Sequence, residues 1–108
     1  MHIPLETALT QLKQSGKLFE EVFIHGTLSI EIYKPVERDF QQPHEKDEVY
    51  IIISGNGEFI NDGTTIHFQP GDFLFVPAGV EHRFLHFSPD FVTWVIFYGT
   101  KGGEKKSV

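Results

Sequence analysis

Two short segments of this 108-residue chain bring imidazole and carboxylate side chains close together in the sequence. The first, residues 44–55, contains His44 and Glu48. The second, residues 71–82, ends at His82. Two imidazoles and one carboxylate form the ligand set of a facial triad, which binds a divalent transition metal and leaves the opposite coordination positions open. The segments therefore indicate a mononuclear metal site whose open half faces a substrate or dioxygen.

Strand geometry decides which of these side chains can meet. In an extended chain, residues an even number apart point to the same face. Gln42, His44 and Glu48 therefore share a face if the strand runs without a bulge. Gln41 is the alternative to Gln42 if the strand bulges. A tight Pro-Ala-Gly turn precedes His82 and places it at the rim of a barrel. If both strands line one barrel, we expect the ligands to converge.

The apolar pattern predicts one helix followed by many short strands. Pro4 suits the first position of a helix over residues 4–15, and Gly16 ends it. From residue 18 the period changes to strands separated by turn residues, with a polar loop at residues 35–43. Strands are expected at residues 18–25, 28–34, 49–53, 58–61, 64–68, 73–76, 82–87 and 91–98. This pattern, with 11 phenylalanines, predicts a β-sandwich or barrel.

The spacing within the two segments carries a family resemblance. Residues 44–55 read His, three residues, Glu, six residues, Gly; residues 71–82 read Gly, five residues, Pro, one residue, Gly, two residues, His. In these spacings the chain resembles the two signature motifs of the cupin superfamily, and in particular a group of small single-domain cupins. The resemblance implies an all-β double-stranded β-helix, or jelly-roll barrel, at residues 17–100. A short helix at residues 1–16 would pack outside it, and residues 101–108 would form a mobile tail.

The resemblance also implies a ligand set with one departure. The position of the family's first histidine holds Gln42, whose amide oxygen is a weaker, neutral donor. The implied metal ligands are Gln42, His44, Glu48 and His82, and the metal is iron, manganese, nickel or zinc. Glu48 is also available for proton transfer. The family's asparagine after the second-motif histidine falls at His86, expected as a barrel-lining residue, with a supporting contact or a substitute ligand as alternatives.

These observations favour two functions. The first is a metal cupin that acts on or binds a small organic molecule, as a dioxygenase, isomerase or lyase if it is an enzyme. The alternative is a non-catalytic module that binds a small ligand, with or without metal. Fold alone does not choose between them.

Composition restricts the partners and the location. The net charge of −6 argues against a nucleic-acid-binding face. No apolar run reaches membrane-spanning length, the N-terminus lacks a signal pattern, and the chain has no cysteine, so we expect a cytoplasmic protein.

Residues 49–53 are apolar on both faces, so the face turned away from the barrel needs a cover. A homodimer supplies that cover most simply, with the N-terminal helix as the alternative. Asp47 points away from Glu48 in an ideal strand and is expected to be a solvated or interface carboxylate. A set of mostly aromatic residues is expected to lie mainly in the core: Phe59, Ile66, Phe73, Phe75, Phe84, Trp94, Ile96 and Tyr98.

Overall fold

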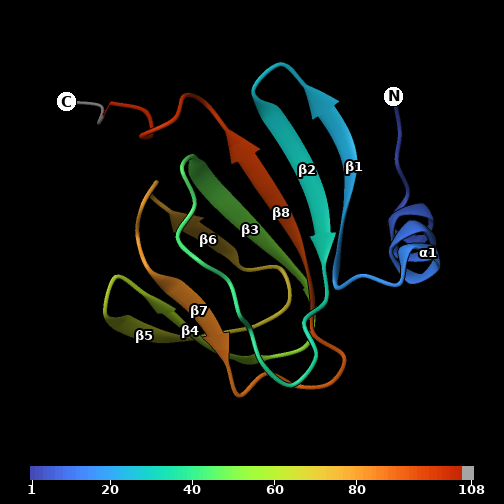
Figure 1. Ribbon diagram of the computed structural model, residues 1–108. Coiled ribbons are helices and arrows are strands. Elements are labelled where there is room, and N and C mark those ends of the chain that lie inside the picture. Colours follow the sequence, from blue (N-terminus) through green and yellow to red (C-terminus); the bar gives the residue numbers. More distant parts are fainter. Residues whose placement is uncertain (106–108) are drawn as a thin grey trace.

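The described part of the computed structural model, residues 1–105, contains one helix followed by two antiparallel sheets (Figure 1). The five-stranded sheet has the order β1-β2-β8-β3-β6, and the three-stranded sheet has the order β5-β4-β7. The elements are α1 (Leu5–Ser15), β1 (Phe19–His25), β2 (Leu28–Tyr33), β3 (Asp47–Ser54), β4 (Gly57–Asn61), β5 (Thr64–Phe68), β6 (Phe73–Val76), β7 (His82–Leu85) and β8 (Val92–Tyr98). This confirms the predicted all-β fold with a single N-terminal helix.

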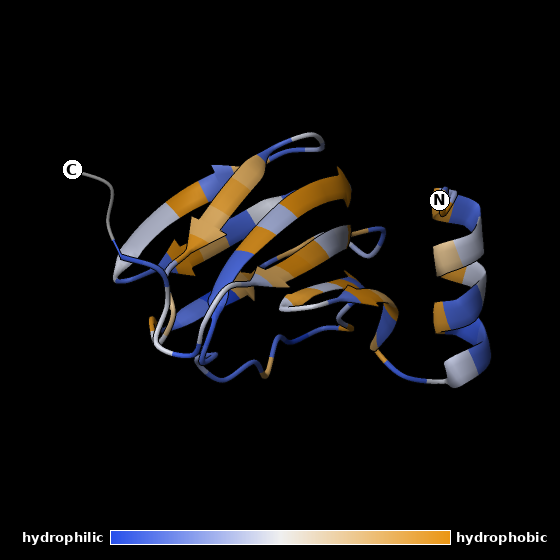
Figure 2. Cartoon of the chain, turned by 90° about the horizontal axis from the view of Figure 1, so that it is seen from above, coloured by the Kyte–Doolittle hydropathy of each residue, from blue (hydrophilic) through white to orange (hydrophobic). Residues whose placement is uncertain are grey.

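Helix α1 ends where the sequence predicts. Pro4 precedes its first turn, and Gly16 follows its last turn in the left-handed conformation at φ 69°. Its apolar face contributes Ala8 and Leu12 to a cluster on the outer side of the five-stranded sheet, with Ile32 and Val92. The helix lies beside β1 and β2 and away from the three-stranded sheet (Figure 1), and Figure 2 shows it at one side of the strands. The N-terminal helix is thus one cover of the outer sheet face.

The main core lies between the two sheets and is largely aromatic. The Phe84 ring lies at 4.6 Å from the Phe59 ring and at 4.6 Å from the Phe91 ring, measured between centroids. The buried residues of this core are Tyr33, Tyr50, Ile52, Phe59, Phe68, Leu74, Val76, Phe84, Phe91 and Val95. Tilted and edge-on arrangements at such distances are the ones that aromatic rings prefer, and closely packed interiors deform little. The core therefore gives the strands that line the barrel a rigid support.

Part of the predicted core lies instead on the outer sheet face or at the surface. Phe73 is 63% exposed and Phe75 is 41% exposed, both on β6, and Ile66 on β5 is also exposed. The error has a simple cause. Strand alternation assigns these residues to one face but does not say which face is turned to the barrel.

The segment before β3 is not an extended strand, and the segment after β8 is attached to the rest of the chain by a hydrogen bond. Strand β3 begins only at Asp47, so residues 34–46 form an irregular segment rather than an extension of the strand. After β8, the backbone amide of Gly102 donates to the carbonyl of Glu45 at 2.7 Å. Residues 106–108 lie outside the described residues, and the mobility of residues 101–108 stays a prediction. Within residues 1–105, no helix has the length and apolar character needed to cross a membrane.

Candidate metal centre

Glu48 stands at the centre of the site, on the barrel side of β3. It pairs in register with Val76 of β6 and Phe97 of β8, so strands on both sides fix its backbone. The residue is only 1% exposed. Neither carboxylate oxygen has a hydrogen-bond partner in the described part of the chain. A buried carboxylate without a partner is costly, so this position demands a cation or a proton.

His82 faces Glu48 from the first position of β7. Its ring Nδ1 lies 2.9 Å from the carbonyl oxygen of Val80, which accepts the Nδ1 hydrogen. That bond fixes the tautomer and leaves Nε2 as the free ring nitrogen. Nε2 lies 3.1 Å from Glu48 Oε1, yet the contact is not a well-formed hydrogen bond, since both atoms lack a partner within residues 1–105. The ring is thus oriented for a ligand rather than for its carboxylate neighbour alone.

His44 completes the triad from the irregular segment before β3. Its Nε2 lies 3.8 Å from Glu48 Oε2, and its ring packs edge-on against Phe97 at 4.9 Å between centroids. The ligand atoms of His44, Glu48 and His82 all lie within 4.8 Å of one another. The structure therefore brings together the three residues predicted from the two sequence segments, in a group that could hold a metal ion.

A backbone contact joins the two motif segments directly. The amide of Gly79 donates to the carbonyl of His44 at 2.7 Å, and Gly79 has a φ of 78°, where a side chain would be strained. A second motif glycine, Gly55, has no room for a side chain, because a Cβ there would lie 2.5 Å from the Cα of Phe91. The turn that contacts His44 therefore favours glycine at position 79, and close packing against Phe91 requires glycine at position 55.

The two histidines differ in their protonation. Burial lowers the pKa of His44, and this outweighs the attraction of the Glu48 carboxylate, while His82 lowers it further. For His82, burial also acts to lower the pKa, but the interactions with Glu48 and with the Val80 carbonyl outweigh it and raise the pKa above its usual value. His44 is thus neutral at neutral pH, as a metal ligand must be, and His82 holds a proton more readily.

Gln41 lies beside the triad, in contact with His44. The Gln41 Oε1 atom lies 3.4 Å from His44 Nε2 and accepts a hydrogen bond from the Tyr50 hydroxyl at 2.8 Å. Gln42 is exposed and lines a different cavity together with His82, so its role as a ligand stays a prediction. Strand parity does not apply here because the chain is irregular before Asp47.

Asp39 is a buried residue that the sequence analysis did not single out. Its carboxylate accepts hydrogen bonds from the Tyr33 hydroxyl at 2.7 Å and from the Phe84 amide at 2.9 Å. It also accepts from the backbone amide and the side-chain Nε2 of Gln41, at 3.1 Å and 2.8 Å. The second bond turns the Gln41 amide nitrogen toward Asp39 and its oxygen toward His44. An aspartate two residues before Gln41 in a polar loop was the available signal.

Two sequence expectations, for Asp47 and His86, are corrected. Asp47 is not solvated but buried, and its carboxylate accepts from the amides of Ala78 at 3.0 Å and Glu104 at 2.8 Å. It therefore anchors the turn that leads to His82. His86 does not line the barrel, because β7 ends at Leu85 and His86 adopts a φ of 50°. Its exposed ring pairs with Glu58 at 2.7 Å.

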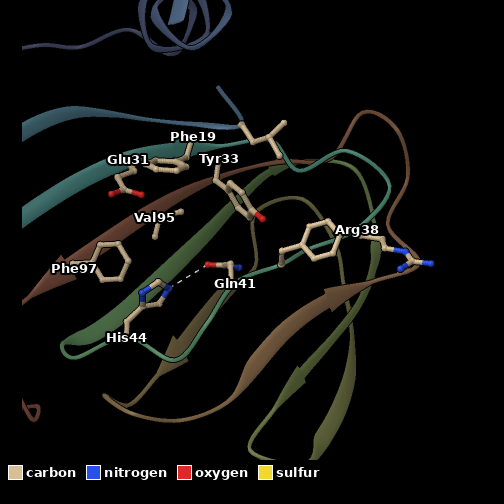
Figure 3. Close-up of a pocket in the computed structure, with 10 residues that line it drawn as sticks. Phe19, Glu31, Tyr33, Arg38, Gln41, His44, Val95 and Phe97 are labelled. Carbon is tan, nitrogen blue, oxygen red and sulfur yellow. Dashed lines mark hydrogen bonds between the residues drawn. The ribbon is translucent and has the colours of Figure 1, made fainter. Parts of the chain in front are cut away.

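A cavity of about 460 Å³ opens beside the triad (Figure 3). His44 and Gln41 form one wall, and Glu31, Val95 and Phe97 come from the five-stranded sheet. The remaining lining residues are Leu18, Phe19, Tyr33, Arg38 and Phe40. Mostly apolar walls with a few polar groups are typical of small-molecule sites.

The family of the chain follows from this fold and site. A family model described as a cupin domain matches residues 29–98, and the chain belongs to this family. A solved structure of unknown function from Rhizobium leguminosarum superposes with a TM-score of 0.74 at 18% identity, covering 93% of this chain and 97% of that one. That likeness supports the cupin fold alone.

Two curated relatives match part of the chain. An uncharacterized protein of Streptomyces coelicolor is 41% identical over 59 residues, covering 55% of this chain and 56% of that protein. An acireductone dioxygenase of Rhodopseudomonas palustris is 49% identical over 45 residues, covering 38% of this chain and 27% of that protein. The chain thus spans about half the length of the first relative and about a quarter of the second.

Proposed function

We propose that this cupin holds one divalent transition-metal ion at His44, Glu48 and His82 and presents it to a small organic molecule in the adjoining cavity. The observation that supports this most strongly is the set of buried acceptor atoms without hydrogen-bond partners: both oxygens of Glu48 and Nε2 of His82. A cation among them would satisfy all three at once. The histidine tautomer fixed by Val80 supports the same conclusion.

The ligand types suit several metals. Two imidazoles and one carboxylate accept iron, manganese, nickel or zinc, and the ion would supply Lewis acidity or a site for dioxygen. Glu48 has two oxygens near the imidazoles, so one oxygen can hold the ion while the other accepts a proton from a bound molecule. The cavity walls would orient that molecule and exclude water from it.

Gln41 is proposed as the neutral neighbour of the ion in place of Gln42. Its amide oxygen already lies near His44 Nε2, and Asp39 holds the amide in that orientation. Burial, with Glu48 nearby, raises the pKa of Tyr50 well above its usual value, so its hydroxyl stays protonated and donates to the same oxygen. The amide oxygen thus has one donor and retains a lone pair for the ion.

Dioxygen chemistry is the first reaction to test, because the chain shares a 45-residue match with acireductone dioxygenases. Oxygen uptake by the iron-loaded protein with enediols and diketones would support it. A ligand-binding role without turnover is the second candidate. It is favoured by the neutral glutamine beside the triad, and it is supported if ligands bind but no product forms.

Metal-dependent stabilisation tests the proposed site. Because a metal that binds only the folded protein stabilises it by mass action, added Mn²⁺, Fe²⁺, Ni²⁺ or Zn²⁺ should raise the melting temperature of the EDTA-treated protein. The rise should disappear in His82→Ala and persist in His67→Ala, which removes an exposed histidine of β5. Equal responses of the two variants would contradict the proposal.

We also propose that two copies associate through the outer face of the five-stranded sheet. Five apolar residues lie in register across all five strands: Phe23, Ile30, Ile96, Val49 and Phe75. Helix α1 covers a different part of this face, around Ile32 and Val92, and Phe75 is exposed. Light scattering should give a dimer for the wild type and a monomer for Phe75→Lys, with Val36→Lys in an exposed loop as the control. A monomeric wild type would contradict the proposal.

A further inference from the structure

Glu31 brings a carboxylate into the apolar cavity beside the triad. It lies on β2, where its register neighbours are Glu21 on β1 and Val95 on β8. In Figure 3 its carboxylate lies near Phe19, Val95 and Phe97, across the cavity from His44. The side chain is partly buried, so water screens its charge incompletely.

No residue of the described chain neutralises this carboxylate. Within residues 1–105, no ion pair or hydrogen bond reaches the Glu31 side chain. Its neighbour Glu21 is also acidic, and a hydrogen bond from Ser29 holds that carboxylate at 2.8 Å. Burial, with the charges of Glu21 and Glu48, raises the pKa of Glu31 to about 7. The position therefore lacks a positive partner.

The other charged residues around the cavity also favour a positively charged ligand. Glu31 lines the cavity, and two further carboxylates, those of Glu48 and the fully bonded Asp39, contact the lining residues His44 and Gln41. Arg38 is the one lysine or arginine among the lining residues, and its guanidinium points away from Glu31 and His44 in Figure 3. An anionic ligand would meet repulsion here, whereas a cation would be attracted.

We propose that the cavity binds a small primary amine with an aromatic or apolar body, its ammonium group against Glu31 and its body among the phenylalanine rings. Aromatic faces attract an ammonium group as well as an apolar body, and the rings of three phenylalanines, Phe19, Phe40 and Phe97, line the cavity together with that of Tyr33. This assignment extends the proposed function by naming the ligand class, and the ammonium contact itself does not involve the metal.

Three probes with the same phenyl body separate charge from shape. Phenethylamine is a cation, 2-phenylethanol is neutral and phenylacetate is an anion. In calorimetric titrations at about pH 8, where Glu31 is mostly ionised, the amine should bind about tenfold or more tightly than the alcohol, and phenylacetate should bind most weakly. Absence of saturable amine binding, or an alcohol that binds as tightly as the amine, would overturn the assignment.

A matched pair of variants locates the contact. Glu31→Gln should weaken amine binding about tenfold and leave alcohol binding unchanged. Glu6→Gln removes one exposed carboxylate of α1 and should change neither affinity. An amine affinity unchanged by Glu31→Gln would overturn the assignment.

Titrations of EDTA-treated and Zn²⁺-loaded protein separate the two proposals. Amine binding without any metal binding would refute the metal site and keep the ligand class. Metal binding without a preference for the amine would refute the ligand class and keep the metal site.

Discussion

His82 presents Nε2 to Oε1 of Glu48 at 3.1 Å, inside a barrel where neither atom has a hydrogen-bond partner among residues 1–105. The Nδ1 hydrogen is already given to Val80, so in the neutral ring two acceptor atoms face each other. A proton on either group, or a cation between them, relieves this contact. The pair therefore requires a proton or a cation.

This relationship predicts how the metal-free protein responds to pH. Because the folded-state pKa of His82 is raised, its pairing with Glu48 contributes stability that is fully present below the unfolded pKa of about 6.5 and is lost as pH rises through the folded value. Thermal unfolding in EDTA should therefore show stability falling as the pH rises above about 6.5. The His82→Gln variant should lack that part of the decline, and identical profiles for the two proteins would contradict it.

Metal affinity should rise with pH, whereas the stability of the metal-free protein should fall. The ion competes with the proton on His82, so metal affinity should increase as pH rises and the proton leaves. A melting-temperature increase with Zn²⁺ that shrinks with rising pH would count against the site.

The two glutamines provide a second prediction. Gln41→Ala should weaken metal affinity about tenfold, because it removes an amide oxygen beside His44, whereas Gln42→Ala should leave the affinity unchanged. Competition titrations with a chelating dye measure both. A larger effect from Gln42→Ala would restore the ligand set that strand parity predicts.

Asp39→Asn tests the support of Gln41. The asparagine amide would place a donor against groups that now donate to Asp39, so we expect a loss of about 1–3 kcal/mol in unfolding free energy. Metal affinity should fall about 10–100-fold as Gln41 is released from its orientation. Urea unfolding and metal titration measure the two effects. Metal affinity equal to that of the wild type would mean that Asp39 serves folding alone.

We expect Glu31→Gln to stabilise the protein at high pH but not at low pH. The folded-state pKa of Glu31 is about 7, above its unfolded value of 4.5. The folded protein therefore loses stability as the pH rises from the unfolded to the folded pKa. Near pH 4.5 both proteins should be about equally stable. At about pH 8 the variant should be more stable by about 1 kcal/mol, less than the full shift implies because the carboxylate is partly exposed. Urea unfolding at both pH values measures it, and a variant less stable at the higher pH would contradict it.

Much of the fold was predictable because its signals are local. Gly16 ends the helix, and the turn glycines bound the short strands, so the elements matched closely. The same reasoning failed for Phe73 and Phe75, because alternation separates two faces without saying which one is covered.

The triad was predictable from motif spacing, but its surroundings were not. Gln42 was expected on the face of Glu48 by counting along a strand, and the chain there is not a strand. Asp39 acts through contacts with Phe84 and Tyr33 from two different strands, which no local pattern reveals. Long-range hydrogen bonds thus define the part of the site that sequence reasoning missed.

The most direct test is the metal content of the purified protein after equilibration with Mn²⁺, Fe²⁺, Ni²⁺ or Zn²⁺ and removal of free ions. Elemental analysis should give about one ion per chain for the wild type and almost none for Glu48→Gln, which keeps the shape of the side chain but removes its charge. A wild type that carries no more metal than Glu48→Gln would contradict the metal site.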